Sequence, residues 1–151
     1  MKGLQISQRN KDKMIQTRTK VKIIDNTGGK IGRCIKVYKK KKGVGRIGDI
    51  IMVSIIETDK EAQKRGGSIQ IKKGEIHKGL IVRTKKKLKS KKNGEWRRYE
   101  DNSIILVQKE TKKIIVPIGN RVIEPISGDF PLFQDNLQKF EKILAIAPKS
   151  I

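Results

Sequence analysis

Cysteine and histidine are nearly absent from this chain, which contains one of each, Cys34 and His77. A single cysteine excludes an intramolecular disulfide, and one cysteine with one histidine cannot assemble a zinc finger. Cys34 lies in an apolar, strand-like run, so we expect a small buried or half-buried strand residue and not a reactive thiol. His77, between Ile76 and Lys78, is expected on a strand surface or beside a phosphate, and not as a catalytic base. Acidic residues nowhere cluster with Ser, His or Cys, so the sequence predicts neither an enzyme nor a metal or cofactor site.

Acidic residues and long apolar runs are also scarce. Asp and Glu number 15 against 37 Lys and Arg, which gives a formal net charge of +22. No apolar run approaches the roughly 18 residues of a membrane span, and the basic stretches are not amphipathic helices, so no membrane partner is expected. Such an excess of positive charge is typical of nucleic-acid binding. The length of 151 residues fits one domain with a sizeable core.

The most distinctive stretch runs from Gly79 to Leu106. Apolar triplets bracket it, and within residues 83–98 nine cations face a single acid, Glu95. Asn93-Gly94 at its centre favours the two positive φ angles of a type I′ hairpin turn. We therefore expect two strands rooted in the core that extend as a charged ribbon over residues 83–98. A solvated hairpin without a partner is the alternative, but repulsion among unbalanced cations disfavours it.

Short alternating runs separated by turn residues surround this ribbon. Asp25 to Gly29 reads as a turn, because Asx side chains cap the backbone and glycines accept positive φ. Many short strands joined by such turns predict a small β-barrel, in which closure removes exposed edges. The expected strands are Ile15–Ile24, Ile31–Tyr38, Asp49–Ile56, Ile69–Ile71, Ile76–Thr84, Ser103–Gln108 and Ile114–Ile118.

A glycine-rich loop follows four lysines, Lys39 to Lys42. Gly43, Gly45 and Gly48 satisfy the G-x-G-x-x-G spacing, which indicates a dinucleotide site only when a helix follows. A β-branched run follows here instead. We therefore expect a loop that fits a phosphate backbone, not a nucleotide pocket.

The two ends of the chain differ from the basic middle. Residues 1–13 are polar and are expected to become ordered only on a partner. Residues 127–151 are charge-neutral and contain all three Phe. Asp129 could cap a helix with apolar positions at three- to four-residue spacing. That face either packs on the barrel or, in part, meets a protein. The apolar positions are Phe130, Phe133, Leu137, Phe140 and Leu144.

From Met14 onward the chain resembles the universal large-subunit ribosomal protein family numbered fourteen. The family's Asp-Asn-Ser/Thr-Gly turn and Cys-Ile-Lys-Val strand correspond to Asp25–Gly28 and Cys34–Val37. Its long spaced signature continues through the basic stretch, with Ile105 where Val is usual. The matching positions are Gly79, Leu80, Ile81, Val82, Asn93, Gly94, Tyr99 and Asn102.

The resemblance implies an all-β fold, a small five-stranded β-barrel with a projecting β-ribbon and short C-terminal helices. It implies domain limits of 14–126 for the barrel and 127–151 for a helical segment packed on it. The implied function is a structural constituent of the large ribosomal subunit that binds large-subunit rRNA at the interface. Implied partners are small-subunit rRNA through an inter-subunit bridge, the families numbered nineteen and three, and a ribosome-silencing or anti-association factor.

A free-standing nucleic-acid-binding barrel is the alternative, and it requires exposed aromatics for base stacking. Only Tyr38, Trp96 and Tyr99 qualify, and the odd spacing of the last two places them on opposite faces of a strand. One ring is expected at the ribbon base and the other against RNA or protein. A nuclease would need clustered acids for metal, which are absent.

The candidate sites follow from charge and from the resemblance. The expected RNA-binding residues are Lys36, Lys39, Lys40, Lys41, Lys42, Arg46, Lys72, Lys73, Lys78, Arg83, Lys85, Lys86, Lys87, Lys89, Lys91, Lys92, Arg97 and Arg98. The expected protein-partner surface is Asn120, Arg121, Phe133 and Lys142. Extra segments and a preference for Lys over Arg and Ile over Val suggest an A/T-rich organellar genome. The expected location is a mitochondrial ribosome, with a plastid or a bacterial cytoplasm as alternatives.

Overall fold

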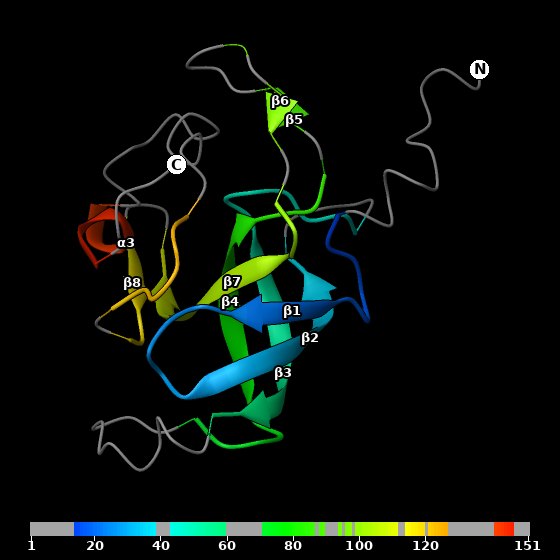
Figure 1. The fold of residues 1–151 in the computed structure, drawn as a ribbon. Helices are drawn as coiled ribbons and strands as arrows, with labels where there is room; N and C mark the ends of the chain where they lie inside the picture. The colour runs from blue at the N-terminus through cyan, green and yellow to red at the C-terminus, as the bar shows by residue number, and fades with distance from the viewer. Residues whose placement is uncertain are drawn as a thin grey trace.

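The computed structural model describes residues 14–38, 43–59, 71–86, 88–89, 94, 96–97, 99–111, 114–119, 121–126 and 141–146. One sheet has the order β1-β2-β3-β4-β7-β8, and β1 also pairs in parallel with β7, which closes a ring of five strands (Figure 1). The elements are β1 (Lys20–Ile23), β2 (Gly29–Val37), β3 (Ile50–Thr58), β4 (Ile76–Arg83), β5 (Leu88–Lys89), β6 (Trp96–Arg97), β7 (Ser103–Glu110), β8 (Ile115–Pro117) and α3 (Glu141–Ile146). The predicted small β-barrel is confirmed.

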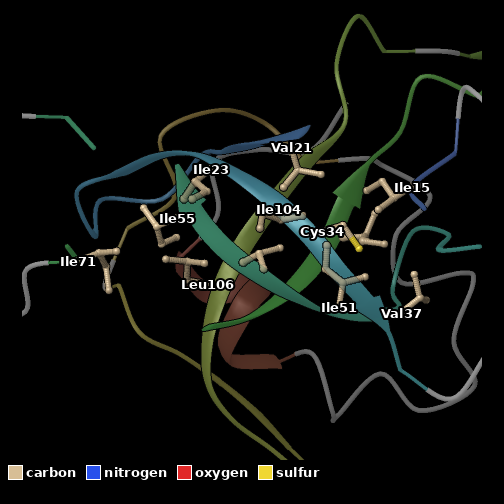
Figure 2. Close-up of a cluster of buried hydrophobic side chains, with 12 residues drawn as sticks. Ile15, Val21, Ile23, Cys34, Val37, Ile51, Ile55, Ile71, Ile104 and Leu106 are labelled. Carbon is tan, nitrogen blue, oxygen red and sulfur yellow. The ribbon is translucent and has the colours of Figure 1, made fainter. Parts of the chain in front are cut away.

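Alternation along the strands fills the barrel interior with aliphatic side chains. In β1, Val21 and Ile23 point inward while Lys20 and Lys22 are exposed. Interior side chains from β1, β2, β3 and β7 meet one another in Figure 2, where Cys34 lies among them, and Ile81 of β4 belongs to the same cluster. Cys34 is 1% exposed, and burial raises the pKa of its thiol to about 11. The expectation of a small buried thiol is confirmed.

A second apolar layer covers the outer face of β4 and β7. Leu80 and Val82 of β4 and Ile105 and Val107 of β7 are buried there, beneath residues from β8, the 122–126 segment and α3. Strands buried on both faces read as continuous apolar runs rather than alternating ones. This double burial explains the two apolar triplets that bracket the basic stretch. The covering side chains are Ile115, Val122, Ile126 and Ile143.

The turn after β1 contains a buried carboxylate. Asp25 is 3% exposed, and its Oδ1 accepts hydrogen bonds from the backbone N–H and the hydroxyl of Thr27 at 3.3 and 2.6 Å. Its Oδ2 accepts the N–H of Leu106 in β7 at 2.8 Å. Burial raises the pKa of Asp25, and the hydrogen bonds partly oppose that rise. The predicted Asx turn therefore also ties β1 to the strand that closes the barrel.

The first predicted strand is wrong over residues 15–19. Thr19 donates its N–H to the carbonyl of Gln16 at 3.1 Å, and its hydroxyl accepts the N–H of Gln16 at 3.0 Å. This side-chain hydrogen bond competes with a strand ladder and produces a turn with Arg18 at φ 76°. Ile15 instead bridges Gly45 and fills the barrel interior.

One further prediction is confirmed and two meet the structure only in part. β3 follows Gly48, so the glycine-rich loop leads into a strand and not a helix, as expected. Ile71 is buried in the barrel interior but lies outside any strand, and its predicted partners 69 and 70 fall outside the described residues. The C-terminal helix is described only over Glu141–Ile146, so the three Phe positions also fall outside.

Candidate nucleic-acid interface

The basic ribbon projects from one end of the barrel as the β5–β6 pair (Figure 1). Leu88 pairs with Arg97, and Lys89 pairs with Trp96. A two-residue turn at Asn93-Gly94 in a regular hairpin would place Lys89 opposite residue 98, so the observed register is two residues away from that expectation. Gly94 does adopt positive φ, at 73°, while Asn93 lies outside the described residues. The ribbon is present, with a different register from the predicted one.

An ion-pair network holds the root of this ribbon. Arg83, the last residue of β4, places Nη2 at 3.0 Å from both a carboxylate oxygen of Asp101 and Oε2 of Glu124. It also donates to the Ser103 hydroxyl at 2.9 Å. Lys22 of β1 joins the network through Glu124 Oε1 at 2.7 Å. Two cations and two acids balance here, which gives the root no net charge.

The sequence predicts Arg83 as an exposed cation of the ribbon, but the structure buries most of its side chain. Its side chain is 11% exposed, and its guanidinium lies 5.8 Å from the centre of the Tyr99 ring. Tyr99 is half-buried at the ribbon base, whereas Trp96 is 61% exposed. The two rings therefore occupy different environments. Because β6 ends at Arg97 and Tyr99 lies outside it, their placement on opposite faces of one strand stays a prediction. The sequence pattern could not show that Arg83 is engaged by acids from two other segments.

Beyond the root, Lys86 of the ribbon and Arg46 of the glycine-rich loop repel each other as like charges. The N–H of Lys85 is fixed by the side-chain oxygen of the buried Asn102 at 2.9 Å, which directs the chain into the ribbon. Beside it, partial burial lowers the pKa of Lys86, and repulsion from Arg46 lowers that pKa further. Arg46 comes from the glycine-rich loop, so the structure unites two predicted basic segments. Adjacent like charges of this kind favour an anion between or over them.

Hydrogen bonds hold the turn that carries Arg46. Asp49 Oδ2 accepts the N–H of Arg46 at 2.7 Å, and the N–H of Asp49 donates to the Arg46 carbonyl at 3.0 Å. Gly48 has φ 95° and donates to the carbonyl of Ile81 in β4 at 2.8 Å. Positive φ at this position of the turn is readily accepted by glycine. The loop is therefore held against the strand from which the ribbon starts.

Lys36 and Lys78 also lie together, on the outer face of the barrel. Both align with Met52 of β3, from β2 and β4 respectively. Their ammonium groups lie 5.7 and 5.5 Å from the centre of the Tyr38 ring. The register of β2, β3 and β4 therefore brings two of the predicted RNA-binding residues together.

Lys72 and Lys73 are exposed in a turn that precedes β4, while the ribbon follows β4. The turn therefore lies at the opposite end of the barrel from the ribbon (Figure 1). Among the other predicted RNA-binding residues, only the backbone of Lys89 and Arg97 is described. Outside the described residues lie Lys39, Lys40, Lys41, Lys42, Lys87, Lys91, Lys92 and Arg98.

The predicted protein-partner surface is described at two of its four positions. Arg121 is exposed and is held to the turn after β1, because its N–H donates to Asn26 Oδ1 at 3.2 Å. Val122 donates to the carbonyl of Ile146, which places α3 and its exposed Lys142 beside this segment. Ile123, absent from the prediction, is 64% exposed here. Asn120 and Phe133 lie outside the described residues.

The sequence prediction also omitted two exposed cations, Lys20 and Arg33, which face each other across β1 and β2. The alternation of β1 could have identified Lys20 as outward-facing, but only the register reveals its partner. In the part of the chain that the structure describes, no three His, Cys, Asp or Glu residues are grouped to hold a metal. Within the same residues, no helix is long and apolar enough to cross a membrane.

A comparison with known protein families identifies one that spans nearly the whole chain. The family model described as ribosomal protein L14p/L23e matches residues 14–151. The matched region includes the barrel, the ribbon and the C-terminal segment, while residues 1–13 precede it.

Proposed function

The chain belongs to the ribosomal protein L14p/L23e family, a structural and non-enzymatic constituent of the large ribosomal subunit, and from that premise we propose that it binds large-subunit rRNA through its ribbon and the adjacent basic loop. Lys and Arg side chains that replace counterions on phosphates would supply the affinity. The barrel would set the direction in which the ribbon points.

The observation that carries this proposal is the contrast between the ribbon root and the surface next to it. At the root, Arg83 and Lys22 are neutralised by Asp101 and Glu124. One step further, Lys86 is close enough to Arg46 for repulsion to lower its pKa. A ribbon with a neutral, hydrogen-bonded root and a charged surface beyond it suits a rigid arm directed at phosphate.

Contacts with the rest of the ribosome extend the proposal. The ribbon, with its exposed Trp96, would contact small-subunit rRNA or a neighbouring ribosomal protein of the families numbered nineteen and three. The surface around Asn120, Arg121, Phe133 and Lys142 would receive a ribosome-silencing or anti-association factor, and the exposed Ile123 offers it an apolar contact. The residue bias and the extra N-terminal segment support a mitochondrial ribosome as the location.

Sedimentation of the native protein tests the proposal. We expect it to co-migrate with large ribosomal subunits from its own cells at moderate salt and to leave them after RNA digestion. The protein would instead remain in the free pool if it were an independent nucleic-acid-binding barrel. Co-migration with organelle-derived subunits, compared with cytoplasmic ones, tests the location separately.

A further inference from the structure

The C-terminal segment 121–126 reaches the root of the ribbon through one carboxylate, that of Glu124. Its Oε2 lies 3.0 Å from Nη2 of Arg83, and its Oε1 lies 2.7 Å from the ammonium group of Lys22. Arg83 ends β4, from which the ribbon starts, while Lys22 belongs to β1 of the barrel. Glu124 therefore joins the ribbon, the barrel and the C-terminal segment at a single point.

The backbone that carries Glu124 is anchored on both sides. Val122 and Ile126, each two residues away, are 2% and 1% exposed and belong to the outer apolar layer. Ile123 donates its N–H to the carbonyl of Ile24 at 2.7 Å, which ties the segment to the residue that follows β1. The carboxylate of Glu124 is therefore attached to packed and hydrogen-bonded backbone.

The other contacts of Arg83 are made with the returning limb of the ribbon. Its guanidinium contacts Asp101 at 3.0 Å and the Ser103 hydroxyl at 2.9 Å, and it lies 5.8 Å from the centre of the Tyr99 ring. These contacts clamp the two limbs to each other. Among the ion pairs found in the described residues, Glu124 is the partner of Arg83 that lies outside both limbs. It therefore relates the clamped limbs to the segment beside them.

Neutralisation alone does not account for this second carboxylate. Arg83 is 11% exposed and needs a counter-charge, but Asp101 already supplies one at the same distance of 3.0 Å. Lys22 is 46% exposed, and ion pairs of such exposed groups contribute little to stability. An acid beside an RNA-binding arm also repels phosphate. The position of Glu124 is explained better by geometry than by charge.

We infer that Glu124 is a positioning residue for the RNA arm, which acts through Arg83 to set the direction in which the ribbon leaves the barrel. The inference deepens the proposed function and rests on it, because a ribbon already held in one direction loses less conformational freedom when it binds RNA. It also places control of the ribbon in the segment that carries the proposed protein-partner surface, where the exposed Ile123 is the immediate neighbour of Glu124.

Time-resolved fluorescence anisotropy of the free protein tests the inference without RNA. Trp96 of β6 is the only tryptophan of the chain, so its fast depolarisation reports motion of the ribbon. Glu124→Gln should increase this nanosecond depolarisation, whereas Glu57→Gln, which replaces an exposed acid on β3, should not. Slow labelling of Cys34 by a thiol reagent verifies that the barrel of each variant is folded. In the Arg83→Gln background, Glu124→Gln should have no further effect.

Two outcomes of the anisotropy measurement would overturn the inference. One is native depolarisation in Glu124→Gln, which would mean that the clamp between the limbs fixes the ribbon by itself. The other is an equal added effect of Glu124→Gln in the Arg83→Gln background, which would mean that Glu124 does not act through Arg83.

Binding to purified large-subunit rRNA provides a second readout, in which charge and position predict opposite signs. Loss of one acid raises the net charge by one, so electrostatics alone would strengthen binding in Glu124→Gln and Glu57→Gln alike. Positioning predicts that Glu124→Gln binds roughly two- to tenfold more weakly, with the native salt slope, since side chains at the root must then be ordered on binding. Binding by Glu124→Gln at least as tight as by Glu57→Gln would overturn the inference while leaving the proposed function intact. A native protein that fails to bind rRNA would instead contradict the proposed function, and the anisotropy would still decide whether Glu124 positions the ribbon.

Discussion

Arg83 and Glu124, which lie 41 residues apart in the sequence, form an ion pair with 3.0 Å between Nη2 and Oε2. The pair joins the end of β4 to the segment that leads toward the C-terminal helix. Asp101, on the returning side of the ribbon, contacts the same guanidinium at 3.0 Å. A residue that the charge pattern assigns to the basic arm is therefore the point at which the arm is fastened to the barrel.

Replacement of Arg83 tests this fastening. Arg83→Gln should lower the free energy of unfolding by about 1–3 kcal/mol, because Asp101, Glu124 and Ser103 lose a charged donor in a largely buried position. Urea unfolding provides the measurement. Exposed Lys109→Gln is the control and should change stability by no more than about 0.5 kcal/mol. Equal stability of the two variants would show that the network does not hold the ribbon root.

Asp25 makes stability depend on pH in a defined direction. Its folded-state pKa is raised by burial, so the unfolded chain ionises first as pH rises. Its stabilising contribution is therefore complete below the ordinary value of 3.8 and is lost as pH rises through the folded-state pKa. Asp25→Asn removes this titration, and its amide must turn an N–H group toward either Leu106 or Thr27.

Urea titrations of both proteins from acid to neutral pH measure the effect. Where Asp25 is protonated, its O–H needs an acceptor as the amide N–H does, so Asp25→Asn should change stability by less than about 1 kcal/mol. As pH rises toward neutral, the variant should gain stability relative to the native chain. The exposed Glu57→Gln substitution should leave stability nearly unchanged. A native chain that gains stability relative to Asp25→Asn as pH rises would mean that the folded state favours the ionised carboxylate.

Cys34 should behave as an inert thiol. With a pKa of about 11 and a position in the barrel interior, it is neither ionised nor accessible at pH 8. A thiol reagent should label the native protein only at the rate of barrel opening, and the urea-unfolded protein at once. Because the chain has one cysteine, the label reports a single site. Labelling of the native protein as fast as the unfolded one would contradict a closed barrel.

The strands and the ribbon could be predicted because they depend on local patterns. Alternation identified β1 and β2, the apolar triplets identified parts of β4 and β7, and clustered charge between those triplets identified the ribbon. The partners of Lys20 and Arg83 could not be predicted, since they depend on register and on contacts between distant segments. The strand expected at Ile15 failed for a different reason. Its alternation was genuine, but the Thr19 hydroxyl satisfies the backbone of Gln16 and makes a turn.

The central claim is that the ribbon is the principal RNA arm, and the salt dependence of rRNA binding tests it most directly. Lys85→Gln/Lys86→Gln, compared with Lys30→Gln/Lys109→Gln, removes the same charge from different places. The account predicts that the ribbon variant binds purified large-subunit rRNA with a log–log salt slope reduced by roughly 1.4–1.8, while the control keeps the native slope. Indistinguishable slopes for the ribbon variant and the native protein would contradict the account.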